Sequence, residues 1–341
     1  MASMTFQAMI ADNNRKSVLL VATFILFTLV VASAIASAIL MSFSPDLRDE
    51  QGLYYGAGIG AIVTAFSAVL MWLGYRFGDQ MILAVSGAKQ IQHADDPQLF
   101  NVVEEMAIAA GVPMPRVYLM QDSAPNAFAT GRDPAHGIVA ITTGLRTKLS
   151  RDELQGVIAH EMAHVRNYDI RLMLLVTVLV GAIVMLADFF WRMSFYGPRS
   201  SSRQSSSSRG RDDKGNALYL VVIVVAVVLA ILAPFFAQII QFAISRQREY
   251  LADASSVELT RNPAGLERAL AKIASDKEVL EVANPATQHL YFTNPIKKFE
   301  ARSSSMFSTH PAIIDRINRL RQLSGQGSMD AAAFEALRGL D

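Results

Sequence analysis

The chain has 341 residues, of which 52% are hydrophobic, and its formal net charge at pH 7 is +1. A composition this apolar excludes an ordinary soluble domain and indicates membrane-spanning segments. The 31 basic residues are balanced by 30 acidic ones, which argues against a nucleic-acid partner. Cysteine is absent, so disulfides, thiolate metal sites and a cysteine nucleophile are excluded.

Four long apolar runs occur along the chain, at about residues 17–42, 53–75, 172–190 and 217–244. Each meets the roughly 20 residues that a spanning helix needs. The first run has a second interpretation as a signal peptide, because Arg15 and Lys16 precede it and "ASAIASA" resembles a cleavage site. Its apolar core is longer than the ~7–15 residues of a signal peptide, so we expect an uncleaved anchor. The many Gly and Ala residues of the second run predict close helix packing.

The segment between the second and third runs is predicted to fold outside the membrane. A helix is expected to begin at Pro97 and to end at Gly111, and "RVYLMQ" and "GIVAITTGL" are typical of short strands. Ser150 and Glu153 form the pattern of a capping box, which predicts the start of another helix. Because neither Gly nor Pro occurs in residues 157–180, that helix is expected to continue without a break.

The second half of the chain contains a segment of different composition. Residues 196–216 are rich in Ser, Arg and Gly and are predicted to be disordered. After the fourth run, "SRQREYLADASSVELT" is expected to be helical. A final amphipathic helix is expected after "STHP", with Ile313, Ile317 and Leu320 on one face.

The motif that carries chemistry is "HEMAH", in the predicted helix that follows the capping box. His160 and His164 are four residues apart, so both imidazoles lie on one helical face and can reach one ion. Glu161 lies beside the first histidine, where its carboxylate can hold a water. This is the HExxH pattern of zinc hydrolases, with two histidine ligands and a glutamate general base.

A catalytic zinc ion needs a third protein ligand and one open position. Since cysteine is absent, the third ligand is a histidine or an acid, and the remaining histidines are His93, His136, His289 and His310. The sequence "REYLAD" offers Glu249 and Asp253, again four residues apart. That pair suits a ligand and a carboxylate that fixes a histidine tautomer, but it also suits a solvated acidic face.

HExxH followed by ExxxD, each beside an apolar run, resembles the HtpX and CAAX prenyl endopeptidase family of membrane gluzincins. "NAFATG", "GIVAITTGL", "HEMAHVRNYDI", "REYLADASSVEL" and "STHPAIIDRINRL" all resemble HtpX-type members, and the resemblance covers nearly the whole chain. It implies that Glu249 is the third ligand of one zinc ion per subunit. It also implies that Asp253 orients a ligand histidine and that Asp169 makes a structural contact.

The expected fold is therefore an α-helical integral membrane protein with about four transmembrane helices. Its catalytic domain is expected to be mainly α, of an α+β zincin-like type with a small β-sheet. We expect two transmembrane helices in residues 1–78 and the first part of the catalytic domain in residues 79–171. A transmembrane pair with the disordered loop 196–216 is expected in residues 172–244, and the second part of the catalytic domain in residues 245–341.

The resemblance implies zinc-assisted hydrolysis of peptide bonds. Glu161 would take a proton from the attacking water and deliver it to the leaving amine. His310 would stabilise the oxyanion, unless it only caps the helix that begins after Pro311. Arg316 is expected to pair near the site, among the residues that bind substrate.

Substrate is expected to add as a strand to "GIVAITTGL", which would be an exposed edge strand beside the zinc. Ile138, Val139 and Ala140 would then contact the substrate backbone. Asn126 would hydrogen bond the same backbone, unless it only forms a turn.

The distribution of charge predicts the orientation in the membrane. Arg15 and Lys16 precede the first run, whereas the loop "SPDLRDEQ" is acidic, so the N-terminus and the catalytic domain are expected in the cytoplasm. The basic loop 196–216 disagrees with a full crossing of the third and fourth runs, which could instead form a shallow hairpin. By resemblance, the expected location is the bacterial inner (cytoplasmic) membrane, as a multi-pass protein.

The favoured function is a zinc endopeptidase that degrades misfolded or damaged membrane proteins, since both motifs adjoin apolar runs. Its partners would be protein substrates and the lipid bilayer, with no nucleic acid. Two alternatives stay open. One is a specific processing protease of the CAAX type. The other is a zinc-binding membrane protein without catalysis, such as a transporter, although no charged residue lies in the middle of a run.

Overall fold

The computed structural model describes residues 6–43, 50–180, 246–276, 278, 280, 290–292 and 311–338. The predicted disordered loop 196–216, the fourth apolar run and His310 lie outside these described residues. The chain divides into two compact units. The first comprises Met1–Ser17, Tyr75–Thr177 and Ile240–Asp341, and the second comprises Val18–Gly74 and Val178–Ile239. The domain bounds expected from the sequence stay a prediction.

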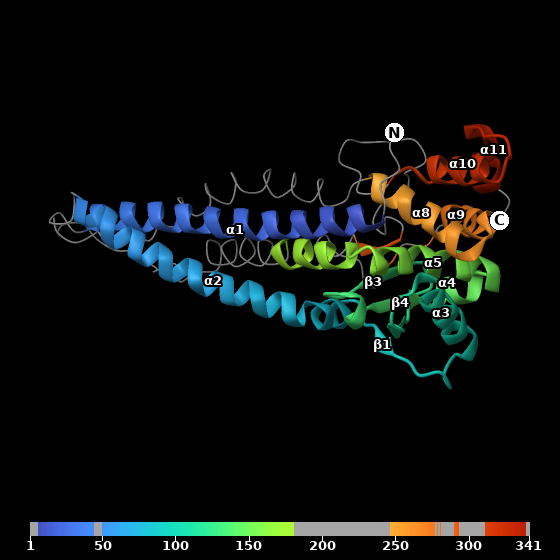
Figure 1. The fold of residues 1–341 in the computed structure, drawn as a ribbon, viewed down its shortest axis with the longest axis horizontal. Helices are drawn as coiled ribbons and strands as arrows, with labels where there is room; N and C mark the ends of the chain where they lie inside the picture. The colour runs from blue at the N-terminus through green and yellow to red at the C-terminus, as the bar shows by residue number, and fades with distance from the viewer. Residues whose placement is uncertain are drawn as a thin grey trace, which may run out of the picture. The chain divides into compact units, whose positions relative to one another are not determined.

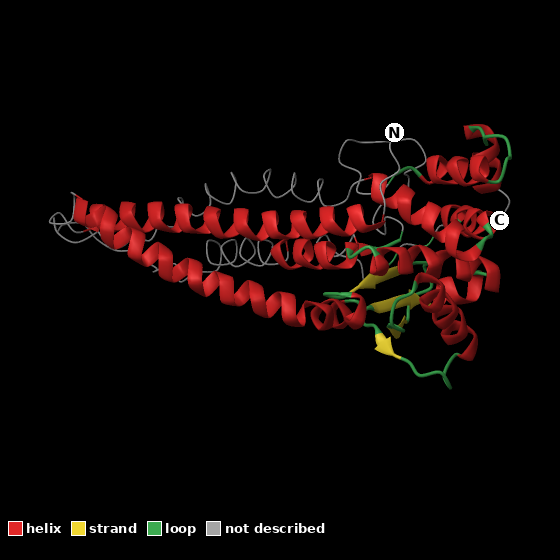
Figure 2. Ribbon diagram, in the orientation of Figure 1, coloured by secondary structure: helices red, strands yellow, loops and turns green. Residues whose placement is uncertain are grey.

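Helices dominate the described residues, and one small sheet accompanies them (Figure 1, Figure 2). A further helical stretch, residues 169–180, follows α5. In chain order the elements are α1 (Phe6–Phe43), α2 (Glu50–Val85), β1 (Lys89–Gln90), α3 (Pro97–Ala110), β2 (Arg116–Met120), β3 (Ala127–Thr130), the 3₁₀ turn η2 (Pro134–His136), β4 (Ile138–Thr142), α4 (Thr143–Lys148), α5 (Arg151–Arg166), α8 (Arg246–Thr260), α9 (Pro263–Ser275), α10 (Ile313–Leu323) and α11 (Ala331–Arg338).

The first two apolar runs form α1 and α2, and both helices are long and apolar enough to cross a membrane. Many of their apolar side chains are exposed, for example Val18 at 69% and Ile62 at 72%, as expected of helices that face lipid. The two helices approach closely through small residues. A Cβ atom on Gly56 would lie 2.6 Å from the backbone nitrogen of Ser37. The close packing predicted from the Gly and Ala content is confirmed.

The sheet has four strands in the order β1-β2-β4-β3 within the described residues. β4 is parallel to β2 and antiparallel to β3, so it has a neighbour on each side, and all five of its residues are buried. The expectation that "GIVAITTGL" is an exposed edge strand is therefore wrong. A continuous apolar run such as "IVAIT" is typical of a strand covered on both faces. The edge next to β4 is β3, built from "AFAT".

The helix boundaries that the sequence predicts are confirmed at α3 and α5. Asp96 accepts a hydrogen bond from Leu99 N–H, Pro97 begins the helix, and Gly111 ends α3 with φ of 67°. At α5, Ser150 accepts from the backbone of Glu153, whose carboxylate accepts from Ser150 N–H at 2.8 Å. The capping box therefore fixes where the helix with the HExxH motif begins.

The expectation of an unbroken helix over residues 157–180 is wrong. α5 ends at Arg166, and Tyr168 adopts a left-handed backbone with φ of 61° before the next helical stretch begins at Asp169. A left-handed conformation costs a non-glycine residue roughly 1–3 kcal/mol, so the surrounding contacts must hold it. Neither Gly nor Pro marks this break, but Asn, Tyr and Asp are weak helix formers and tertiary contacts hold the turn. The break turns Asp169 back toward α5, where its carboxylate meets His164.

α5 is the central element of the first unit. It lies between the sheet and the pair α8 and α9, and it also packs against α3 (Figure 1). Val157, Ile158 and Met162 on this helix are fully buried in one apolar core that extends to α9 and α10. α5 therefore carries the HExxH motif in the buried core of this unit.

Gly156 permits the closest approach of α5 to α9. A Cβ atom there would lie 2.8 Å from the backbone nitrogen of Leu266 and 2.9 Å from its Cα. We expect Gly156→Ala to lower the free energy of unfolding by about 1–3 kcal/mol through overpacking, although alanine favours helices by about 1 kcal/mol. Thermal unfolding in detergent, followed by circular dichroism, measures this effect.

Gly327→Ala is the matched control for that substitution, because nothing lies within 4 Å of a Cβ atom built at Gly327. Its unfolding temperature should match that of the wild type. An unchanged or raised unfolding temperature for Gly156→Ala would contradict the close approach of the two helices.

Candidate metal centre

The two histidines of the HExxH motif meet in the interior of the first unit. α5 carries both on one face, and the Nε2 atoms of His160 and His164 are 3.1 Å apart. Their side chains are 1% and 6% exposed. The four-residue spacing has thus brought two imidazole nitrogens to one point, as the sequence predicts.

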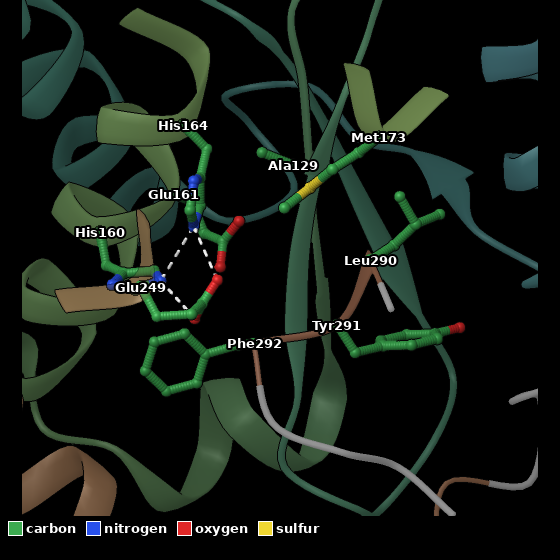
Figure 3. Close-up of a pocket in the computed structure, with 9 residues that line it drawn as sticks. All are labelled: Ala129, His160, Glu161, His164, Met173, Glu249, Leu290, Tyr291 and Phe292. Carbon is green, nitrogen blue, oxygen red and sulfur yellow. Dashed lines mark hydrogen bonds and ion pairs between the residues drawn. The ribbon is translucent and has the colours of Figure 1, made fainter. Parts of the chain in front are cut away.

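α8 contributes a carboxylate to the same point. The Glu249 oxygens lie 3.7 Å from His160 Nε2 and 3.7 Å from His164 Nε2. Within the described residues, these three side chains form the group of His and acidic residues arranged to hold a metal ion. Figure 3 shows the three side chains converging. Two atoms bound to zinc at about 2.0–2.1 Å in a tetrahedral arrangement are about 3.3 Å apart, so these distances fit such an ion.

The hydrogen bonds of the histidines also fit a metal ion. The Nδ1 atom of His160 lies 2.9 Å from Asp253, and that of His164 lies 3.0 Å from Asp169. A carboxylate accepts the Nδ1–H, so each neutral imidazole directs its Nε2 lone pair inward. Two lone pairs that face each other at 3.1 Å repel, unless a proton or a metal ion lies between them. The donor set therefore requires one cation at this point.

The electrostatics of the two imidazoles agree with that requirement. Burial lowers the pKa of His160 to about 4. Burial also opposes the charged form of His164, but the hydrogen bond to Asp169 and the carboxylate of Glu249 outweigh it and raise the pKa of His164 to about 9. Without a metal ion, His160 is thus neutral at neutral pH and His164 carries the proton that a metal ion would replace.

Asp253 is held from the other side by Arg316, which α10 supplies. The guanidinium forms two hydrogen bonds to the Asp253 carboxylate, at 2.7 and 2.9 Å, and a third to the Phe292 carbonyl at 3.1 Å. Arg316 is 1% exposed. Its donors face buried protein acceptors, and its expected place among substrate-binding residues stays a prediction. The bidentate pair explains why the pKa of Asp253 is lowered despite burial.

Glu161 lies beside the cluster with its side chain directed into the same small cavity (Figure 3). Burial raises the pKa of Glu161 to about 7, and the nearby Glu249 carboxylate acts in the same direction. The backbone of Ala129, in β3, hydrogen bonds the Glu161 carboxylate. A carboxyl group with a pKa near neutrality can both accept and return a proton at neutral pH.

The cavity has room for about one water molecule. Besides the cluster, Ala129, Met173 and the segment Leu290–Phe292 line it. Phe292 N–H donates to the Ala127 carbonyl at 2.8 Å, so this segment lies along the outer side of β3. The Phe292 ring also packs edge-on against His160, with centroids 4.9 Å apart.

Several predicted residues do not reach this cavity. Ile138, Val139 and Ala140 are fully buried in β4. His93 and His136 are exposed and interact with Asn101 and Asp133 instead, so the structure does not bring them to the cluster.

Asn126 is buried at the start of β3, where its side chain accepts from Ala127 N–H. That contact is local to the chain. The expected contact of Asn126 with the substrate backbone stays a prediction.

The sequence alone did not reveal the lining residues Ala129, Met173 and Phe292. Ala129 lies in "NAFATG", whose alternation of small and larger residues between two strands is a signal for a third strand. Met173 belongs to an apolar run and carries no separate signal. Phe292 lies in the apolar triplet "LYF" between polar segments, which indicates burial but not its location.

Comparison with known proteins gives consistent results. A family model described as peptidase family M48 matches residues 93–324. A protease HtpX homolog of Listeria monocytogenes serotype 4a (strain HCC23) is 41% identical over 315 residues, which cover 92% of this chain and 98% of the relative. A protease HtpX homolog of Dictyoglomus thermophilum is 41% identical over 325 residues, which cover 95% of this chain and 96% of the relative.

Among solved structures, the crystal structure of Ste24p from S. mikatae is 21% identical in sequence, with a TM-score of 0.45. The match covers 89% of this chain and 67% of that chain.

The matched family region includes α5, α8 and α10, the helices that supply the buried cluster and the arginine behind it. The relatives extend the match over the two apolar N-terminal helices. The resemblance identified from HExxH and ExxxD is thereby confirmed. The chain belongs to peptidase family M48 and is an HtpX-type membrane metalloprotease.

Proposed function

We propose that this protein is a zinc endopeptidase that hydrolyses peptide bonds of misfolded or damaged membrane proteins. The observation that carries the proposal is the buried meeting of His160, His164 and Glu249, with Glu161 in the same cavity. A zinc-binding protein without catalysis would need the three ligands but not Glu161. A buried carboxyl group with a raised pKa beside three candidate metal ligands favours catalysis.

His160, His164 and Glu249 would hold the zinc ion and leave one position open. Bound zinc supplies Lewis acidity, which polarises the scissile carbonyl and lowers the pKa of a water molecule. Asp253 and Asp169 keep the two imidazoles in the tautomer whose Nε2 lone pairs face the ion. Arg316 fixes Asp253 with two hydrogen bonds and so acts through it.

Glu161 would act as general base and then as general acid. Its carboxylate accepts a proton from the attacking water and later donates that proton to the leaving amine. The hydrogen bond from the β3 backbone orients the carboxylate relative to the strand. His310, which lies outside the described residues, is our candidate for the donor that stabilises the oxyanion.

An extended substrate would pair with the outer side of β3 rather than with β4, in the place that Leu290–Phe292 occupies in this structure. In an antiparallel pair, the main-chain groups of alternate residues point to the same side. The Phe292–Ala127 hydrogen bond is of the kind that a substrate strand would make there. Recognition through the main chain selects weakly among sequences, and that suits a quality-control protease better than a processing enzyme of the CAAX type.

The proposed location is the bacterial inner membrane, with four spans and the catalytic unit in the cytoplasm. Arg15 and Lys16 at the start of the first span and the acidic loop that follows it support this orientation. The two described apolar helices support the first pair of spans. We propose membrane proteins as substrates because the motif helix is followed within a few residues by an apolar run.

Replacement of the proposed base tests the chemistry. Glu161→Gln removes the proton acceptor and keeps the shape of the side chain, so cleavage of casein by the detergent-purified, zinc-loaded protein should fall by about 10²–10⁴-fold. Zinc content should stay at the wild-type value. Glu104→Gln, on the exposed face of α3, is the control and should leave the rate unchanged. Cleavage by Glu161→Gln at the wild-type rate would rule out the proposed base.

Removal of the third ligand tests the metal site. Glu249→Ala should weaken zinc binding by more than the ~10–100-fold that loss of an outer partner costs, because a ligand itself is lost. Zinc content after gel filtration measures this loss. Glu258→Ala, exposed on the same helix, should retain zinc. A Glu249→Ala protein with full zinc content would remove Glu249 from the site.

Cysteine labelling in intact bacteria tests the orientation, and the native chain gives no background because it has no cysteine. Glu104→Cys, in the catalytic unit, should react with a membrane-impermeant maleimide only after the inner membrane is permeabilised. Asp46→Cys, between the first two spans, should react in intact cells. Ser205→Cys should behave like Asp46→Cys if the last two runs cross fully. Labelling of Glu104→Cys in intact cells would contradict a cytoplasmic site.

A further inference from the structure

The N-terminal helix reaches the metal centre through Asn13. This side chain is 3% exposed, although it lies at the polar start of an otherwise lipid-type helix. Its Nδ2 donates to Asp169 Oδ1 at 2.7 Å and to the Asn167 carbonyl at 2.8 Å. Asn13 and Asp169 are 156 positions apart in the sequence, so this contact is purely tertiary.

The acceptor of that bond, Asp169, joins three parts of the first unit. Its Oδ2 lies 3.0 Å from His164 Nδ1, and its Oδ1 accepts from Asn13. The guanidinium of Arg248 lies 3.7 Å from the same Oδ1. Because Arg248 precedes Glu249 in α8, one carboxylate connects α1, the end of α5 and the helix of the third ligand.

Asn13 also holds the backbone turn that brings Asp169 to His164. Its second hydrogen bond satisfies the carbonyl of Asn167, the residue at the C-terminal end of α5. The next residue, Tyr168, has the left-handed backbone with φ of 61°. A strained turn persists only where the surroundings over-determine it. The two bonds from one amide, to residues on either side of Tyr168, constrain it in that way.

The consequence for His164 is a fixed orientation. Oδ2 of Asp169 can accept the Nδ1–H of His164 only while the carboxylate keeps its rotamer, and Asn13 binds the opposite oxygen. Outer partners of this kind set the tautomer and direction of a ligand histidine, and their loss typically costs about 10–100-fold in metal affinity.

We propose that Asn13 is a positioning residue of the metal centre, and that through it the first membrane helix is part of the site. The same helix continues without interruption to Phe43. Withdrawal of its first turns from the catalytic unit would release Asp169 and with it His164. The proposal rests on the zinc-dependent function proposed above.

The test is the stability of the zinc complex in full-length protein purified in detergent. Asn13→Ala should lose zinc to an excess of a chromophoric chelator about 10–100 times faster than the wild type. Ser17→Ala is the matched control. Ser17 lies one helical turn further on the same buried face, and within the described part of the chain its hydroxyl has no hydrogen-bond partner. Ser17→Ala should lose zinc at the wild-type rate.

A double-mutant cycle separates positioning from general damage. Asp169→Ala removes the carboxylate that links Asn13 to His164, so this variant should lose zinc quickly. If Asn13 acts through Asp169, Asn13→Ala should add less than about twofold to the rate of zinc release in the Asp169→Ala background, whereas general damage would add the full effect of the single variant.

The outcomes distinguish the two proposals. A wild-type protein that binds no zinc would overturn the proposed function, and this inference with it. A wild-type protein that binds zinc, together with an Asn13→Ala variant that releases it at the wild-type rate, would overturn only the inference. If Asn13→Ala releases zinc quickly but also unfolds at a lower temperature, the double-mutant cycle decides. Non-additive effects on the rate of zinc release support positioning, and additive effects contradict it.

Discussion

The site depends on the pairing of each motif histidine with a buried carboxylate. Asp253 accepts from His160 and Asp169 accepts from His164, and both pairs lie in the interior of the first unit. In a medium of low polarity these bonds decide which nitrogen carries the hydrogen. They direct the Nε2 lone pairs of the two histidines toward each other across 3.1 Å. Two lone pairs at this distance repel unless a proton or a metal ion lies between them. This arrangement of donors fits a metal ion held by the two imidazoles and Glu249.

The rest of the catalytic unit supplies these carboxylates from separate elements. α8 provides both Glu249 and Asp253, α10 provides the arginine that holds Asp253, and the break after α5 provides Asp169. Each of the two aspartates thus has a further partner that fixes its rotamer. One of these arrangements includes a strained residue, Tyr168. The candidate metal ligands are therefore held by contacts that extend to the N-terminal and C-terminal parts of the chain.

Local signals in the sequence were sufficient for the boundaries of α3 and the start of α5 and for the meeting of His160 and His164. The capping box at Ser150, the Pro97 and Gly111 boundaries and the spacing of HExxH each depend on neighbours within a few residues. Contacts between segments that are distant in the sequence could not be predicted from such local signals. The strand order of the sheet places β3, and not β4, at the edge. A hydrogen bond from Asn13 to the Asn167 carbonyl accompanies the break at Tyr168. Arg316 was expected near the site, but its role depends on Asp253, which only the packing of α10 reveals.

X-ray absorption at the zinc edge directly measures the atoms that surround the bound metal. Wild-type protein, purified in detergent and loaded with one equivalent of zinc, should show a four-coordinate shell of nitrogen and oxygen at about 2.0–2.1 Å. Two imidazole rings should contribute the outer-shell scattering, from His160 and His164. A six-coordinate oxygen shell, or a spectrum without imidazole scattering, would contradict the account.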